Sequence, residues 1–371
     1  MEIDGIVKIF MIGDLHYGIR NNSVVWKNDM IEFMDKFIED LPDHGFNEDT
    51  DILMLTGDTF HSREFLNVMI VHEVVNLFER LAKKFKRGIF TILGNHDQYY
   101  KRSAAVHTMK VMSQLFSNMH VFTEAEPLTI NGNVRFLMLP WHDDLPVLDS
   151  AMASNPGADY LFSHIDIQDF KYNKSARVDK GIEQASLKRF KRVYNGHLHH
   201  KQEQGNTLCI GSPYQMDSGD SETPRGYYVV RIADDMLSEE YFENASSPRF
   251  VSYEFDDLMN MGFDRLAEVM GKNYVSVHIP CSAARNFSYA AFSELLAYRK
   301  IAPRKLEFKQ YEDSYGIDDT KFDATSDFNL AVTAKSILEE KKYSHSETEN
   351  VLAYFNQLHT RARSNEKDTV K

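Results

Sequence analysis

The segment Ile52-Leu53-Met54-Leu55-Thr56-Gly57-Asp58-Thr59-Phe60-His61 joins a short apolar run to a cluster of polar side chains. The run Ile52–Thr56 has the length and composition of a buried β-strand. Four further strand-like runs in the first 230 residues end in the same abrupt way: Lys8–Ile12 before Gly13-Asp14-Leu15-His16, Ile89–Leu93 before Gly94-Asn95-His96-Asp97, Tyr160–Phe162 before Ser163-His164, and Val193–Tyr194 before Asn195-Gly196-His197-Leu198-His199.

Two amphipathic stretches lie between the three runs that come first along the chain, Lys8–Ile12, Ile52–Thr56 and Ile89–Leu93. This order predicts the fold class. Val25–Leu41 and Phe65–Phe85 carry apolar residues at helical spacing. Strands that alternate with helices predict an α/β domain. Because ligands of such sheets bind beyond the carboxyl ends of the strands, we expect the five polar clusters to meet at one site.

Length and composition predict an ordinary soluble protein. The chain has 371 residues, of which 43% are hydrophobic and 26% charged, and this length suggests two domains. No apolar run is long enough to span a bilayer, and no secretion signal is recognisable, so we expect a cytoplasmic protein. Cys209 and Cys281 are too few for a disulfide framework, and Cys209 is expected in the core.

The charge of −13 argues against a surface that grips nucleic acid throughout, although a basic stripe, metal ions or a basic partner could supply the attraction. Two basic clusters invite that idea: Lys83, Lys84, Lys86 and Arg87, and Lys188, Arg189, Lys191 and Arg192. Solvated faces are the commoner explanation of such clusters, and direct DNA contact is the alternative.

The chain divides by composition into four predicted parts. Residues 1–240 hold the polar clusters. Residues 245–312 predict a small α+β domain with strands at Tyr274–Ile279 and Lys305–Phe308 and a helix at Ser288–Tyr298. The acidic stretch 313–327 predicts a linker, and residues 328–371 predict two short helices.

The clustered residue types fit metal-assisted hydrolysis of a phosphodiester. Two divalent cations bracket the attacking and leaving oxygens, and they need an anion between them, for which Asp58 is the natural candidate. His197 and His199 are two apart on a stretch expected to be extended, so they would share one face, each serving one cation. No thiolate takes part, so nitrogen and oxygen donors leave manganese, iron and zinc open.

The five clusters resemble the calcineurin-like metallophosphoesterase superfamily over residues 6–232, and their details resemble its SbcD-type DNA-repair branch. The second cluster reads Gly57-Asp58-Thr59-Phe60-His61 where protein phosphatases of the superfamily carry Asp-Arg, and Asp97 stands where those phosphatases have Glu. Leu139-Pro140-Trp141 and Ile210–Gln215 are similar to SbcD-type segments. Pro224-Arg225-Gly226-Tyr227 is similar to phage recombination endonuclease subunits.

The resemblance implies a four-layer α-β-β-α sandwich with a small α+β capping domain and C-terminal helices. It also implies roles for individual residues. Asp14, His16, Asp58 and His199 would hold one metal, and Asp58, Asn95, His164 and His197 the other. His96 would act beside the scissile phosphate, His61 would position the DNA strand, and Asp97 would orient His96. Manganese is the implied metal, with magnesium as the alternative.

In function, the resemblance implies a DNA exonuclease and endonuclease that processes ends in recombination and repair. It would work as a homodimer within a heterotetramer with an SbcC-like ATPase, in the host cytoplasm if a phage encodes it. The C-terminal helices would dock on that ATPase or pack on their own chain. A stand-alone phosphoesterase of nucleotides or phosphoproteins is the alternative, and a catalytically dead scaffold is disfavoured because no ligand is missing.

Three neighbouring residues are expected to have no part in the chemistry. His200 is expected to be an exposed loop residue, and Asp143 and Asp144 are expected to form a solvated turn.

Overall fold

A computed structural model describes residues 1–311 apart from 174–175, 222 and 235. It separates two compact units, Met1–Phe250 and a second that begins at Val251. The predicted linker 313–327 and the predicted helices 328–371 lie outside the described residues. The domain boundaries given above therefore stay predictions.

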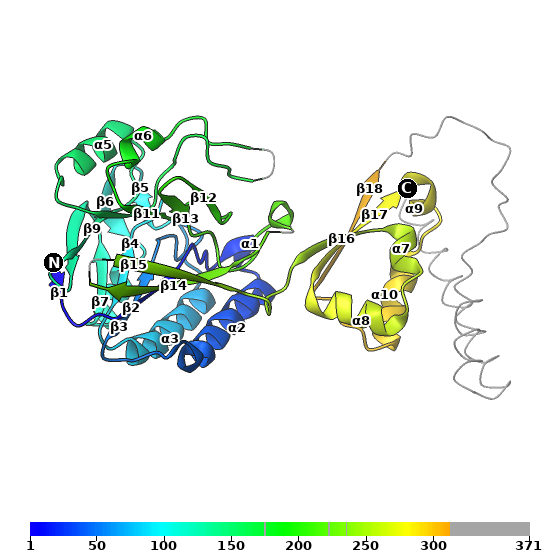
Figure 1. Ribbon diagram of the computed structural model, residues 1–371. Helices are drawn as coiled ribbons and strands as arrows, with labels where there is room; N and C mark the ends of the chain where they lie inside the picture. Colours follow the sequence, from blue (N-terminus) through cyan, green and yellow to red (C-terminus); the bar gives the residue numbers. More distant parts are fainter. Residues whose placement is uncertain (174–175, 222, 235, 312–371) are drawn as a thin grey trace, which may run out of the picture. The chain divides into compact units, whose positions relative to one another are not determined.

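Two β-sheets form the centre of the first unit (Figure 1). The six-stranded sheet has the order β15 (Met236–Glu243), β14 (Gly226–Ala233), β2 (Lys8–Ile12), β3 (Asp51–Leu55), β4 (Ile89–Ile92) and β7 (Met119–Phe122). The seven-stranded sheet has the order β1 (Glu2–Ile3), β8 (Glu126–Ile130), β9 (Val134–Leu139), β10 (Tyr160–Ser163), β11 (Arg192–Asn195), β13 (Thr207–Cys209) and β12 (Gln202–Gln204).

The central strands are apolar on both faces because both faces are covered. In β2, Ile9 and Met11 belong to the core between the two sheets. The alternate residue Phe10 points to the outer side, where its ring centroid lies 5.9 Å from that of Phe37 and 5.6 Å from that of Phe85. The continuous apolar runs of the sequence are therefore two-sided strands.

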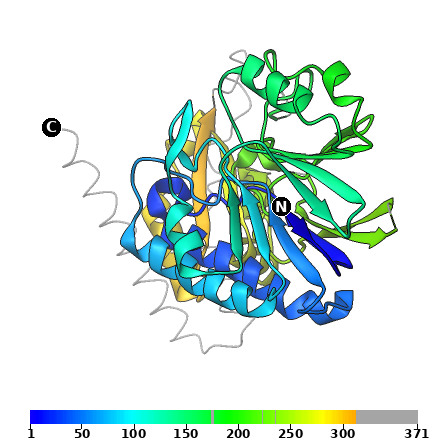
Figure 2. The ribbon, with the colours of Figure 1, turned by 90° about the vertical axis from the view of Figure 1, so that its left-hand side faces the viewer.

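Helices cover the outer face of each sheet (Figures 1 and 2). Helices α2 (Val24–Asp40) and α3 (Val68–Lys84) lie along the six-stranded sheet, and the Asn67 side chain caps α3 by accepting from the Met69 amide at 2.9 Å. Helices α5 (Leu145–Ala153) and α6 (Gln184–Leu187) bury apolar residues against the seven-stranded sheet. The predicted α-β-β-α sandwich is confirmed.

Short elements complete this unit, and none of the described helices is long and apolar enough to cross a membrane. They are α1 (Ile19–Asn22), η1 (Leu41–His44), β5 (Gln98–Tyr100), β6 (Ser103–His107), α4 (Lys110–Leu115) and η2 (Ser218–Asp220).

The second unit has a three-stranded sheet and a core of its own. The sheet order is β16 (Phe250–Glu254), β17 (Tyr274–Pro280) and β18 (Lys305–Tyr311), and β17 and β18 are parallel. The strands and the helix predicted in this region are present. Its helices are α7 (Phe255–Met259), α8 (Phe263–Lys272), α9 (Cys281–Ala284) and α10 (Tyr289–Tyr298).

Parallel pairing decides where the polar clusters of the first unit lie. Strands β2, β3 and β4 are parallel, as are β9, β10 and β11, so within each sheet their carboxyl ends share one edge. Each polar cluster follows one of these ends. Loops far apart in the sequence are thereby brought to a single place.

Candidate metal centre

Three residues with left-handed backbone conformations shape the loops of the site. His16, Asp58 and His197 have φ values of 50°, 49° and 69°. Such angles cost about 1–3 kcal/mol in residues other than glycine and occur most often at functional sites. The His16 amide donates to the Asp58 carbonyl at 2.8 Å, which joins the first two loops.

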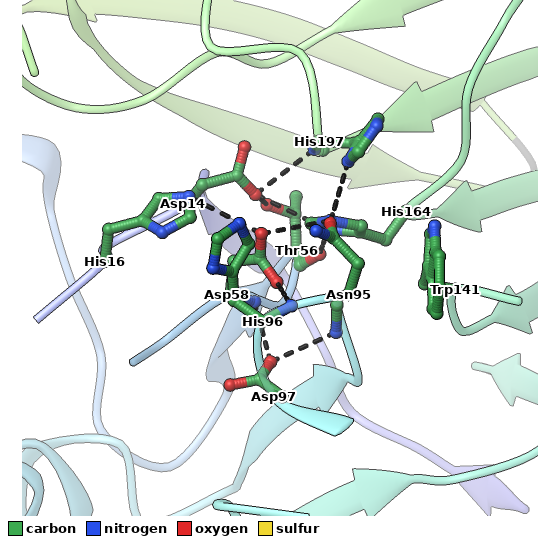
Figure 3. A network of polar contacts seen from close by, with 12 residues as sticks. Asp14, His16, Thr56, Asp58, Asn95, His96, Asp97, Trp141, His164 and His197 are labelled. Carbon is green, nitrogen blue, oxygen red and sulfur yellow. Dashed lines mark hydrogen bonds and ion pairs between the residues drawn. The ribbon is translucent and has the colours of Figure 1, made fainter. Parts of the chain in front are cut away.

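Asp58 lies between imidazoles that come from different loops (Figure 3). Its Oδ2 is 3.5 Å from Nε2 of His16 and 3.4 Å from Nε2 of His164, and its Oδ1 accepts from the His96 amide at 2.7 Å. Burial favours the neutral acid, but His164 and His16 outweigh it and hold the pKa of Asp58 far below its usual range. The side chain is thus an anion enclosed by nitrogen donors.

Lone pairs converge on one side of Asp58. Nδ1 of His164 is 2.7 Å from the Thr56 carbonyl, which only accepts, so this nitrogen carries the proton and Nε2 faces the Asn95 Oδ1 at 3.0 Å. His197 likewise directs Nε2 at Asp166 and leaves Nδ1 2.9 Å from the same Asn95 oxygen. Acceptors gathered in this way need a positive charge among them.

The pKa of His164 also indicates that a positive charge is favoured here. Burial lowers this pKa, but the charges of Asp58 and Asp14 and the hydrogen bonds of the ring outweigh burial and raise it to about 9. The carboxylates around His164 thus favour a positive charge at this point of the site.

The other side of Asp58 holds Asp14, His16 and His199. Nε2 of His199 is 3.1 Å from Nε2 of His16. Oδ1 of Asp14 accepts from Thr56 Oγ1 at 3.0 Å, whereas its Oδ2 is buried and has no hydrogen-bond partner among the described residues. Buried carboxylate oxygens in proteins nearly always have a hydrogen-bond partner, so this orphaned atom fits a metal ligand.

The structure brings together all seven side chains that were predicted to bind metal, and their nitrogen and oxygen donors suit divalent transition metals. Their binding of metal stays a prediction. The seven are Asp14, His16, Asp58, Asn95, His164, His197 and His199.

His61 and His96 lie at the rim of this cluster. Ring nitrogens of His16, His61 and His96 are all within 4.8 Å of one another. Nδ1 of His96 donates to the His61 carbonyl at 2.5 Å, so its Nε2 is the nitrogen left for chemistry. Burial and the neighbouring His96 lower the pKa of His61 to about 4, so His61 is neutral at physiological pH.

The side-chain contacts of Asp97 among the described residues are to backbone amides and the Thr108 hydroxyl, and not to the His96 ring that it was expected to orient. Its carboxylate accepts from the amides of Asp58 at 2.7 Å, Thr59 at 3.2 Å and Gly94 at 3.1 Å. Burial and the charge of Asp58 raise its pKa to about 7. Asp97 therefore ties the Asp58 loop to its own loop, while the His61 carbonyl holds the His96 ring.

Gly94 allows the close approach of these two loops. A Cβ added at this position would lie 2.1 Å from Oδ1 of Asp58. No side chain fits there, which explains the glycine in the third polar cluster.

The segment that carries His197 and His199 is turned, not extended as expected. His197 is left-handed, and the Leu198 amide donates to the Gly196 carbonyl at 2.7 Å. The two rings still reach opposite sides of Asp58, but because the chain turns between them.

His200 is buried, and the expectation of an exposed loop residue was wrong. It is 8% exposed, and its Nε2 lies 3.0 Å from Oδ1 of Asp220, a buried carboxylate that its sequence neighbours do not reveal. Cys209 is fully buried, as predicted.

Several side chains of the two basic clusters form ion pairs with carboxylates of the same chain. This favours the interpretation of the clusters as solvated faces. Lys83 pairs with Glu79 at 2.6 Å and Lys86 with Glu48 at 2.5 Å. In the second cluster, Arg192 pairs with Glu239 at 2.6 Å and with Glu203 at 2.7 Å.

Asp166 is a functional candidate that sequence reasoning missed. Its Oδ1 is 3.0 Å from Nε2 of His197 and also accepts from the Tyr172 hydroxyl. A carboxylate behind an imidazole fixes the ring and its tautomer and raises its strength as a ligand. The only signal in the sequence is its position two residues after His164.

We expect Asp166→Asn to lower the affinity for divalent cations by about 10–100-fold, because His197 loses the acceptor that fixes its ring. Calorimetric titration with manganese measures this affinity. Asp169→Asn, an exposed carboxylate on the same loop, is the matched control and should leave the affinity unchanged. Equal affinities for the Asp166 variant and the wild type would show that the contact has no such effect.

Two sheets that direct imidazole, carboxylate and amide donors to one point define the class of metal-dependent phosphoester hydrolases. The calcineurin-like phosphoesterase family matches residues 7–209, and the chain belongs to this family. Membership confirms the predicted family, the predicted fold class and the predicted enzyme class, a metal-dependent phosphoesterase. The family uses divalent metals, in agreement with the donor set.

Two relatives carry nuclease names. The chain is 24% identical over 229 residues to exonuclease subunit 1 of Enterobacteria phage T4, which covers 60% of this chain and 64% of the phage protein. It is 22% identical over 269 residues to a subunit of the SbcCD nuclease of Staphylococcus saprophyticus, which covers 63% of this chain and 68% of that protein. The chain thus matches slightly less than two thirds of the length of the phage relative.

Proposed function

We propose that this protein is a two-metal DNA nuclease with exonuclease and endonuclease action at DNA ends. The observation that carries the proposal is the position of Asp58 between His16 and His164, with a set of metal-type donors on either side. An anion so placed suits two neighbouring divalent cations better than one.

The ligand sets of the proposal follow the two sides of Asp58. Asp14, His16 and His199 would hold one cation with it, and Asn95, His164 and His197 the other. When bound, such a pair activates a water molecule and stabilises the charge that develops on the phosphate. Manganese is the proposed ion, and magnesium is the alternative.

The rim histidines would act on the substrate. His96, held by the His61 carbonyl, would present Nε2 to the leaving oxygen and donate its proton. His61, neutral and half-buried beside it, would position the strand. Asp97 would act through the backbone, by keeping the Asp58 and Gly94 loops together.

The nuclease names of the relatives support DNA as the substrate. One of these names also supports a partner protein. The Staphylococcus relative is named as one subunit of a nuclease called SbcCD. We propose that this chain likewise works in the cytoplasm as a homodimer within a heterotetramer, with an SbcC-like ATPase, in recombination and repair. Affinity for DNA would then be shared with the partner, which suits a chain of net charge −13.

We expect the purified full-length chain with manganese to degrade linear duplex DNA, and a chelator to abolish the activity until manganese is restored. Product lengths on a gel measure this, with and without the SbcC-like ATPase and ATP. Bis(p-nitrophenyl) phosphate serves as the small reporter in parallel.

The outcomes separate the proposal from its alternatives. Hydrolysis of the reporter without any cleavage of DNA, even with the ATPase present, would indicate a stand-alone phosphoesterase. A chain that binds two cations yet hydrolyses neither substrate would be a scaffold.

A further inference from the structure

Arg225 is a buried cation that contacts the backbone of a proposed metal ligand. It is 4% exposed, and it belongs to the motif Pro224-Arg225-Gly226-Tyr227, for which the proposed chemistry has no use. Its Nη1 donates to the carbonyl of His199 and, at 2.8 Å, to Oγ of Ser212. The guanidinium therefore holds the segment that carries His199.

Asp220 balances the charge of Arg225. It is 3% exposed, and its Oδ1 lies 2.6 Å from Nη2 of Arg225 and 3.0 Å from Nε2 of His200. Its Oδ2 accepts from the Met216 amide at 2.7 Å. A buried ion pair contributes little to stability compared with apolar residues of the same size, so its presence suggests a role in geometry.

Hydrogen bonds extend this network to the first metal-ligand loop. The Ser212 amide donates to the His199 carbonyl at 3.0 Å, and Oγ of Ser212 donates to the Tyr214 carbonyl at 2.8 Å. The Tyr214 hydroxyl donates to the carbonyl of Leu15, the residue between Asp14 and His16. One network thus holds the backbone at His199 and at Leu15, the residue between Asp14 and His16, on the same side of Asp58.

The ligands on the other side are oriented by different residues. His164 is fixed by the Thr56 carbonyl and His197 by Asp166. The contacts that fix these two rings thus come from residues outside the Arg225 network, while the Thr56 hydroxyl and the His197 amide also donate to Oδ1 of Asp14.

The field of Arg225 explains why it needs Asp220. An unbalanced guanidinium would repel a divalent cation bound at His199. Oδ1 of Asp220, 2.6 Å from Nη2 of Arg225, balances that charge. The ion pair can thus fix the loop without opposing metal binding.

We propose that Arg225 and Asp220 form a positioning pair for the metal held by Asp14, His16, Asp58 and His199. Loss of the pair lowers the affinity of that half for its cation and leaves the other half unchanged. This inference rests on the proposed two-metal centre.

Manganese titration of the full-length Arg225→Met variant tests the inference, with calorimetry for affinity and electron paramagnetic resonance for metal–metal coupling. We expect the wild type to bind two cations with a coupled signal. The variant should keep one tight cation with a six-line signal and bind the second about 10–100-fold more weakly. Arg225→Lys should rescue the coupling in part, because Lys keeps the charge but not the fork of donors.

Lys8→Met is the matched control, because it also removes the cation of a buried ion pair. Lys8 begins β2, at the end of the strand away from Asp14 and His16, and its Nζ lies 3.4 Å from Oδ2 of Asp51. This control should lower the melting temperature and still give the coupled signal. Ser212→Ala, which removes an acceptor of Arg225 without stranding a charge, should weaken the second cation to a smaller extent and replaces Arg225→Met if that variant does not fold.

Each result is decisive. If Arg225→Met binds two cations with wild-type affinity and coupling, the inference is overturned but the proposed centre is not. The same holds if Lys8→Met loses as much affinity for the second cation as Arg225→Met does. A wild type that binds fewer than two cations would overturn the proposed centre and this inference with it.

Discussion

Asp58→Asn is expected to reduce phosphodiester hydrolysis by about 10³-fold or more and to abolish the binding of at least one cation. A bound cation supplies several kcal/mol of charge stabilisation, and about 4 kcal/mol corresponds to roughly this factor. Asp58 lies between imidazoles of both halves, at 3.5 Å from His16 and 3.4 Å from His164. Metal analysis after dialysis, together with turnover of bis(p-nitrophenyl) phosphate, measures both effects.

A buried carboxylate on β3, the strand that precedes Asp58, provides the control. Asp51 is fully buried at the start of the strand, where it pairs with Lys8 at 3.4 Å and accepts from the Asn47 amide at 2.9 Å. Asp51→Asn should lower the melting temperature while two cations stay bound. If Asp58→Asn bound metal as the wild type does, Asp58 could not be the bridging ligand.

His96→Ala is expected to lower DNA cleavage by about 10²–10⁴-fold while metal binding stays intact, because a general acid contributes a factor of this size. The loss should depend on the leaving group. p-Nitrophenolate is a weak base that departs without a proton, so turnover of bis(p-nitrophenyl) phosphate should fall by less than about tenfold. Steady-state rates on both substrates, at saturating manganese, measure the difference.

His120→Ala is the control for the removal of a ring. His120 is a half-buried residue of β7 whose ring stacks on Phe90 with centroids 4.9 Å apart, and its loss should affect stability and leave both rates unchanged. An equal loss on DNA and on the reporter would argue against proton donation by His96. It would point instead to a role in binding the phosphate.

The sequence predicted the members of the site because strand direction constrains them. Asp14, Asp58 and Asn95 follow three parallel strands, so once the runs before them are recognised as buried strands, their meeting is a matter of topology. The same reasoning places His164 after β10 and His197 after β11. The alternation of buried strands with helices predicted an α/β domain, whereas the four-layer sandwich was implied by the family resemblance.

What escaped prediction depends on torsion angles and on partners distant in the chain. The turn at His197 needs a left-handed backbone conformation, which cannot be predicted from the residue types of the polar cluster. Asp97 accepts from amides at Asp58 and Thr59, although a motif pairs it with its neighbour His96. Asp166 and Asp220 have no motif of their own, and only the folded chain reveals that they bind His197 and His200.

The origin of the ligands in both sheets has a consequence for synthesis of the protein. Asp14, His16, Asp58 and Asn95 follow strands of one sheet, whereas His164, His197 and His199 follow strands of the other. A growing chain that has not yet reached residue 199 lacks part of the proposed ligand set. In the proposed centre, hydrolysis would therefore begin only after both layers have assembled, and the bound cations would link the two sheets.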